Sequence, residues 1–254
     1  MLANPGLVDH YLERIGLTSA PTVDLDGLTA LQHAHMTAVP FENLDVFHGV
    51  AVDTNVESSI RKILEDNRGG WCFELNGAFA WLLEALGFEV ALLGAAVMLK
   101  GPSAVVDHLT LEVSLEEPYL VDVGFGDAFV QPIRLNQGGP QDGNAGTFEL
   151  MASSQGTTLT RHDAEGFPEP LYRFKRTHQT LDEFTAASDL LQSDKSLHWH
   201  EKQIATRLLG DGADRISLTG TTLTRTVGGV VESSTLDEAA VDETLRNEFG
   251  LTRT

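Results

Sequence analysis

Cysteine and long apolar runs are scarce in this sequence, and each scarcity excludes a class of protein. The only cysteine among 254 residues is Cys72, which rules out an intramolecular disulfide and leaves packing, metal ligation or chemistry as reasons for the thiol. No window approaches the length of a membrane span, and residues 1–17 mix charged side chains with apolar ones without a basic leader. We therefore expect a cytoplasmic protein with no membrane partner.

Positive charge is also scarce. The chain has 17 basic residues, five of them lysines, against 37 acidic ones, and its net charge is −20. Such a surface repels the phosphates of nucleic acids and anionic lipids, so neither is expected as a partner. It also repels itself unless salt screens the charges. The composition therefore fits either adaptation to a salt-rich cytoplasm or an ordinary acidic protein, and only the first should lose structure at low ionic strength.

Apolar periodicity divides the chain into parts of different character. Residues 1–87 show helical spacing, interrupted at Gly16 and Pro40, and indicate a small helical bundle. After residue 87 the period changes to two, in short segments joined by turn residues, which predicts an antiparallel sheet or barrel. Further strands precede a last helix, which a capping box of Thr235 and Glu238 should begin and Gly250 should end.

The segment RGGWCFELNG, residues 68–77, places Cys72 where a glycine-rich loop enters a helix. Unpaired backbone N–H groups and the positive end of the helix dipole favour a thiolate at that position. A neighbouring imidazolium would favour it further and give a nucleophile. The alternative is a small buried hydrophobic residue, which a lone cysteine often is.

Two residues of the predicted sheet are candidates to activate that thiol. His108 opens an alternating strand, and its parity places it with Thr110 and Glu112, opposite the apolar face. Asp122 lies in the apolar run YLVDVGFG, residues 119–126, where a buried carboxylate needs a partner. A histidine N–H is suitable, because the carboxylate then orients the imidazole toward the cysteine. Taken singly, His108 is better interpreted as a surface histidine, and Asp122 could instead be a strand-end aspartate bonded to turn amides.

In this order, Cys72, His108 and Asp122 resemble the triad of the arylamine N-acetyltransferase family. The chain has RGGWCFELNG where that family usually has RGGYCFE-N, and it also has PFENLDV at 40–46 and DVGFGD at 122–127, followed by Pro132. The resemblance is closest over residues 7–135 and looser beyond them. Several motifs in the right order are more specific than any single cysteine and histidine pair.

The resemblance implies an α+β fold with a helical bundle (1–87), a central antiparallel β-barrel (88–190) and an α/β lid (191–254). It implies acetyl-CoA as donor, an arylamine, arylhydrazine or related amine as acceptor, and a thioester on Cys72 as intermediate. By similarity, further site residues fall into a donor group, an acceptor group and a supporting group. These are Gly124, Gly126 and Asp127 for the donor, Phe125, Trp71 and Phe41 for the acceptor, and Arg68, Glu42 and Asn76 as support.

The chain departs from the family at two places. An arginine common in the strand after the catalytic helix is replaced by Ala95-Ala96-Val97, and residues 193–199 lack the usual Ser-Thr-x-Pro-x-Ser-x-Phe pattern. Both departures concern the substrate and donor sites. For the phosphates of coenzyme A, the candidate cations are Arg68, Lys100 and Arg134.

Other functions remain open from the residues alone. An amide synthase of the same family keeps the triad with a different acyl thioester, a cysteine hydrolase or transglutaminase-like peptidase uses the same three groups, and a silent binding module would not need the thiol. The pairs His33 with His35 and His198 with His200 lack a second soft ligand, so we expect no metal.

Overall fold

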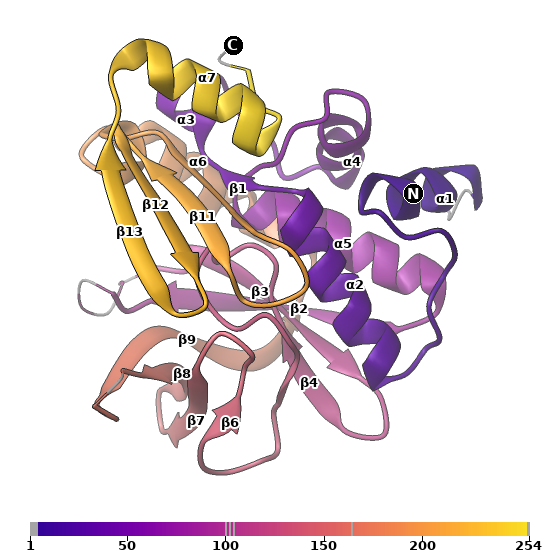
Figure 1. Ribbon diagram of the computed structural model, residues 1–254. Coiled ribbons are helices and arrows are strands. Elements are labelled where there is room, and N and C mark those ends of the chain that lie inside the picture. Colours follow the sequence, from indigo (N-terminus) through magenta and orange to yellow (C-terminus); the bar gives the residue numbers. More distant parts are fainter. Residues whose placement is uncertain (1–4, 100, 102, 104, 164, 253–254) are drawn as a thin grey trace.

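The structure, a computed structural model, describes residues 5–99, 101, 103, 105–163 and 165–252 (Figure 1). The helices of the first third are α1 (Pro5–Arg14), α2 (Leu25–Ala38), α3 (Leu44–His48), α4 (Val56–Leu64) and α5 (Cys72–Leu86). Every residue of α5 from 72 to 83 is buried, and Gly87 ends the helix in the left-handed region at φ 100°. Within the described part of the chain, no helix is long and apolar enough to cross a membrane.

An antiparallel sheet of eight strands forms the middle of the chain, in the order β5-β4-β3-β2-β9-β8-β7-β6. Its strands are β2 (Glu89–Val97), β3 (His108–Ser114), β4 (Pro118–Val121), β5 (Ile133–Arg134), β6 (Gln141–Asp142), β7 (Thr147–Ser153), β8 (Gly156–His162) and β9 (Pro168–Gln179). The Gln141 side chain joins the two edge strands, since it accepts the Arg134 N–H at 2.9 Å and donates to the Arg134 carbonyl at 3.0 Å. The sheet is therefore a nearly closed barrel.

A second antiparallel sheet joins the end of the chain to its first third. Its order is β1-β10-β11-β12-β13, with β1 (Phe41–Glu42), β10 (Ile204–Leu208), β11 (Arg215–Thr219), β12 (Thr222–Val227) and β13 (Val230–Thr235). The last helix, α7 (Glu238–Phe249), lies beside this sheet and shares an apolar core with it (Figure 1). Between the barrel and β10, the chain forms η1 (Leu181–Phe184), α6 (Thr185–Ser193) and η2 (His198–His200).

The predicted α+β fold with an antiparallel barrel is confirmed, but the start of the last helix was predicted wrongly. Thr235 cannot cap that helix because it is the last residue of β13, where it pairs with Thr222. Asp237 caps it instead, its carboxylate accepting the Ala240 N–H at 2.9 Å. The division into domains at residues 87 and 190 stays a prediction.

Candidate active site

Cys72 is the first residue of α5, and the loop before it is tightly packed. A Cβ atom on Gly69 would lie 1.8 Å from the carbonyl oxygen of Pro40, so only glycine fits there. Glu74, two residues after the cysteine, accepts the Trp71 N–H at 3.1 Å and so caps the helix from inside its first turn. This packing places the thiol at the positive end of a buried helix.

His108 and Asp122 form a buried pair beside α5. His108 Nε2 donates to Asp122 Oδ2 at 2.6 Å. Burial by itself lowers the pKa of His108, but the Asp122 carboxylate and the Cys72 side chain outweigh it and raise that pKa to about 10. Burial raises the pKa of Asp122, and His108, Asn76 and Gly124 together reverse this and lower it. At neutral pH the pair is an imidazolium and a carboxylate.

Asn76, one turn after Cys72, fixes the position of Asp122. Its Nδ2 donates to Asp122 Oδ1 at 2.9 Å and to a backbone carbonyl of β3 at 2.6 Å, and its Oδ1 accepts a backbone N–H just after β4 at 3.0 Å. Gly124 adds its own N–H to Asp122 Oδ1 at 2.9 Å. Asn76 therefore connects α5 to β3, which begins with His108, and to the segment just after β4, which includes Asp122.

His108 is buried, so it is not the surface histidine that the residue taken singly also allowed. Its parity does place it with Thr110 and Glu112, but both faces of β3 are buried, one of them against α5, so no face of this strand meets solvent. The His108 ring lies 4.9 Å from the ring of Tyr172, whose hydroxyl is 3.3 Å from the Thr110 hydroxyl. Sequence reasoning missed Tyr172, because nothing local in β9 shows that this strand pairs with β2 beside the histidine.

Cys72 and His108 open onto a cavity of about 380 Å³. The Cys72 Sγ atom lies 4.0 Å from the Asp107 carbonyl oxygen, and the Cys72 side chain contributes to the raised pKa of His108. The remaining walls are largely apolar or aromatic, and they come from the first third, the barrel and the segment before β10: Phe41, Val97, Leu99, Gly101, Ser103, Gly124, Phe125, Leu191, Leu197, His198 and Trp199. A nucleophile and a base at the wall of an apolar cavity suit a largely apolar substrate.

The three predicted acceptor residues occupy different places. Phe41 and Phe125 line the cavity, and Phe125 also lies 5.3 Å, ring to ring, from His108. Trp71 is 1% exposed and lies behind the wall, with its ring 6.2 Å from that of Trp199. Trp199 lines the cavity in its stead, and the sequence offered no signal for it beyond its aromatic character.

The donor turn, residues 124–127, lies partly on the cavity. A Cβ atom on Gly124 would be 2.7 Å from the Cys72 Cα atom, which shows how closely the turn approaches the nucleophile. Gly126 needs its left-handed φ of 92°. Asp127 lies outside the cavity wall and pairs with Arg161 at 3.2 Å and with Arg215 at 3.4 Å. The roles of these residues toward the donor stay predictions.

Two of the three candidate cations for the donor phosphates pair with carboxylates of this chain. Arg68 is buried and pairs with Glu42 at 2.7 Å, so two of the predicted supporting residues form a brace, and Arg68 also pairs with Asp45 at 3.0 Å. Arg134 pairs with Glu117 at 2.8 Å. Lys100 lies outside the described residues. Sequence reasoning did not predict Asp45 in this brace, nor Lys62, which joins it from α4.

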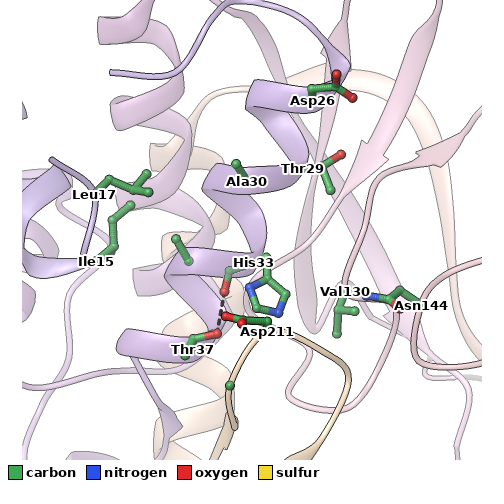
Figure 2. A pocket seen from close by; sticks show the side chains of 13 residues that line it. Ile15, Leu17, Asp26, Thr29, Ala30, His33, Thr37, Val130, Asn144 and Asp211 are labelled. Atoms are coloured by element: carbon green, nitrogen blue, oxygen red, sulfur yellow. Dashed lines mark hydrogen bonds between the residues drawn. The ribbon is translucent and has the colours of Figure 1, made fainter. Parts of the chain in front are cut away.

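A larger cavity of about 550 Å³ lies along α2 (Figure 2), and Cys72 is not among the residues that line it. Its lining includes Asp26, Asp211 and His33, and the His33 Nε2–H donates to the Gly212 carbonyl at 3.0 Å. The residues that line it include no cysteine, so it lacks a nucleophile beside a base. Size alone therefore does not identify the active site, and the chemistry of the smaller cavity does.

The paired histidines of the sequence have separate partners. His35 Nε2 accepts the Tyr11 hydroxyl at 3.0 Å, and His200 Nε2–H donates to the Leu191 carbonyl at 3.3 Å. His198 packs on the ring of Trp199 at 4.2 Å. Among the described residues, no group of three or more histidine, cysteine, aspartate or glutamate side chains is arranged to hold a metal ion.

Comparison with known proteins gives a consistent result. A family model described as N-acetyltransferase matches residues 24–254. The arylamine N-acetyltransferase of Mycolicibacterium smegmatis is 34% identical over 95% of this chain and 90% of its own length, and that of Escherichia coli (strain K12) is 32% identical over 96% and 89%. The structure of Mycobacterium marinum arylamine N-acetyltransferase in complex with CoA superposes with a TM-score of 0.89 at 30% identity, over 96% of this chain and 92% of that one.

Proposed function

The chain belongs to the arylamine N-acetyltransferase family, and we propose that it transfers an acetyl group from acetyl-CoA to an arylamine, arylhydrazine or related amine through an acetyl thioester on Cys72. The observation that carries this proposal is the single thiol of the chain, at the start of a buried helix, beside a histidine that is itself paired with a buried aspartate. A relative of known structure that binds CoA supports the donor.

In the first half-reaction, the Cys72 thiolate attacks the acetyl carbonyl carbon of the donor. The new S–C bond forms as the carbonyl becomes an oxyanion, and collapse of this intermediate breaks the bond to the coenzyme A sulfur. The departing sulfur takes its proton from the His108 imidazolium. His108 is protonated for this step because Asp122 stabilises its positive charge and raises its pKa.

In the second half-reaction, the amine nitrogen attacks the acetyl thioester. His108, now neutral, accepts the proton that the nitrogen loses as the N–C bond forms. The S–C bond then breaks, which releases the amide and restores the thiolate and imidazolium. Asp122 keeps its charge throughout and holds the imidazole in one orientation, as the carboxylate of such a triad does.

Other residues bind the two substrates and stabilise the oxyanion. The N–H of Cys72 and that of a neighbouring residue at the start of α5 stabilise the oxyanion. Phe41 and Phe125 contact the acceptor, with Trp71 behind them. The turn of Gly124, Gly126 and Asp127 receives the pantetheine arm, whose close approach glycine allows. The residues that support the site are Arg68, Glu42 and Asn76. Asn76 does so through its hydrogen bond to Asp122.

For the setting of the reaction, we propose a cytoplasm rich in salt. The chain carries a net charge of −20, and coenzyme A is a polyanion, so their mutual repulsion weakens binding unless ions screen it. In this account, salt both keeps the acidic chain folded and admits the donor.

The test is release of free thiol from acetyl-CoA, with and without an arylamine such as anisidine, at low and high salt, for the wild type and Cys72→Ala. Amine-dependent release that disappears in the variant is the expected result. Absence of release at every salt concentration, with cleavage of amides instead, would favour a cysteine hydrolase. Thiol release from another acyl thioester only would favour an amide synthase.

A further inference from the structure

Lys62 is a lysine side chain held between two carboxylates next to the candidate active site. Its Nζ lies 2.7 Å from Asp45 Oδ2 and 2.8 Å from Glu74 Oε1. The lysine and Asp45 side chains are each 13% exposed and that of Glu74 is 6% exposed. Because the three residues belong to α4, α3 and α5, one ammonium group joins three helices.

Glu74 connects this cluster to the backbone at the nucleophile. One of its oxygens accepts from Lys62, and the other accepts the N–H of Trp71, the residue before Cys72. The same oxygen would be 2.5 Å from a Cβ atom on Gly70, so the carboxylate fills the space that the glycine leaves. A shift of Glu74 would therefore shift the loop that begins α5.

Lys62 is one of two cations that balance the carboxylates beside the start of α5. Glu42, Asp45 and Glu74 provide three carboxylates, and Arg68 and Lys62 provide the two cations that contact them. Burial raises the pKa of Glu74 to about 7, against the lowering effect of Lys62, while for Lys62 the three carboxylates outweigh burial and raise its pKa. Without Lys62, Arg68 would be the one cation beside Glu42, Asp45 and Glu74, and the pKa of Glu74 would rise further. Glu74 would then take up a proton or move away from the other carboxylates, and either change loosens its hold on the start of α5.

We propose that Lys62 is a positioning residue for acetyl transfer, which holds Glu74, and through it the N-terminus of α5, in the geometry that presents Cys72 to the donor carbonyl. The proposal rests on the proposed function for its effect on turnover, but not for its effect on the thiol. A displacement of about 1 Å in such a site can reduce the rate about 100-fold.

The experiment compares Lys62→Met with the double variant Lys62→Met/Glu74→Gln, which removes the excess carboxylate together with the ammonium. Lys175→Met, at an exposed lysine of β9, is the matched control. For each protein, one measures kcat and KM for acetyl transfer, the thermal midpoint, and the rate at which iodoacetamide alkylates the thiol. Because Cys72 is the single cysteine, all alkylation reports on it.

We expect Lys62→Met to lower kcat about 10- to 100-fold and to slow alkylation, with KM for the amine within about twofold of wild type, since the cavity walls are untouched. The double variant should recover about tenfold of the lost kcat, and the control should match wild type. A lower thermal midpoint with unchanged kcat and an unchanged alkylation rate would show that Lys62 only stabilises the fold, and would overturn the proposal. A double variant with a kcat as low as that of Lys62→Met would also overturn it. If the wild type transfers no acetyl group, the proposed function fails, and alkylation still tests the position of the thiol.

Discussion

At the scale of single residues, Gly124 is the glycine of the donor turn that packs directly against the nucleophile. Its backbone passes so near α5 that an added Cβ atom would lie 2.7 Å from the Cys72 Cα atom and 2.8 Å from the Asn76 Nδ2 atom. Gly124→Ala therefore has to push the turn away from the nucleophile or break the hydrogen bonds of Asp122. We expect kcat/KM to fall about 100-fold and the free energy of unfolding to fall by about 1–3 kcal/mol.

The matched control for that prediction is Gly138→Ala. A Cβ atom on Gly138 meets nothing within 4 Å, and its φ is not positive, so alanine should be accepted without effect on activity. Steady-state kinetics with acetyl-CoA and an arylamine, together with urea unfolding, measure both variants. Equal activity of the two variants would show that the turn does not need its close approach to Cys72.

A second prediction at this scale concerns His35, which is fully buried beside the Tyr11 hydroxyl. Burial, with a smaller effect of Arg14, lowers the pKa of His35 from 6.5 to about 3. The stability from the neutral ring is complete above the unfolded pKa of 6.5 and is lost as the pH falls from there toward 3. The slope is about 1.4 kcal/mol per pH unit, or about 2 kcal/mol between pH 6.5 and pH 5.

The measurement for His35 is urea unfolding at several pH values between about 7.5 and about 5. His35→Gln can still accept from Tyr11 but does not titrate, so its free energy of unfolding should fall less on acidification, by about 2 kcal/mol at pH 5. His10→Gln, at an exposed histidine of α1, should keep the wild-type slope. Parallel slopes for all three proteins would mean that His35 is not held neutral.

At the scale of elements, Asn43 fixes the segment before β10, which forms one wall of the cavity, by hydrogen bonds. Its Nδ2 donates to the carbonyls of Trp199 at 2.9 Å and Lys202 at 3.0 Å, and its Oδ1 accepts the Ile204 N–H at 2.6 Å. This one amide therefore fixes η2 and the start of β10 to the first third of the chain. Without it, the backbone of the segment that carries Trp199 loses three hydrogen bonds.

Asn43→Ala should accordingly raise KM for the arylamine about fivefold or more, with a smaller change in kcat, because the wall is loosened while the triad is untouched. The free energy of unfolding should fall by about 2–3 kcal/mol, since buried polar groups lose their partners. Asn247→Ala in α7, whose amide makes one long contact of 3.4 Å to Glu243, is the control. A fall in kcat for Asn43→Ala with KM unchanged would show that Asn43 takes part in the reaction itself, and would contradict this role in the cavity wall.

Elements with a strong local signal were predictable from the sequence. The double glycine before Cys72 marks the start of α5, and the alternation from Leu109 onward marks β3. Two-residue strands carry no periodicity, so β1 and its pairing with β10 were not predictable. The last helix was predicted three residues early, because its capping box competes with β13 for Thr235.

The candidate site divides in the same way. Cys72 and Asp122 could be singled out from the sequence because each lies in a distinctive local motif, and His108 because it opens an alternating strand. Their proximity follows only from the fold. Lys62 and Trp199 could not be singled out, because their roles depend on how α3, α4 and α5 pack and on which segment covers the cavity. Ordinary side chains acquire a function only when the fold brings them to the site.

At the scale of the whole molecule, the net charge of −20 predicts a dependence on salt. Raising KCl from about 0.1 M to about 1 M shortens the Debye length from about 10 Å to about 3 Å, which screens the repulsion between surface carboxylates. The thermal midpoint should rise over this range, as scanning fluorimetry can show. Sucrose, which favours burial without screening charge, is the control. An equal rise in sucrose, or none in KCl, would contradict adaptation to salt.

The most direct test of the whole account is intact-protein mass spectrometry after mixing with acetyl-CoA in the absence of amine. The account predicts a gain in mass of one acetyl group for the wild type, which an arylamine then removes, and no gain for Cys72→Ala. Because Cys72 is the single cysteine of the chain, a thioester can form nowhere else. Acetylation that persists in Cys72→Ala, or that an arylamine fails to discharge, would contradict transfer through this thiol.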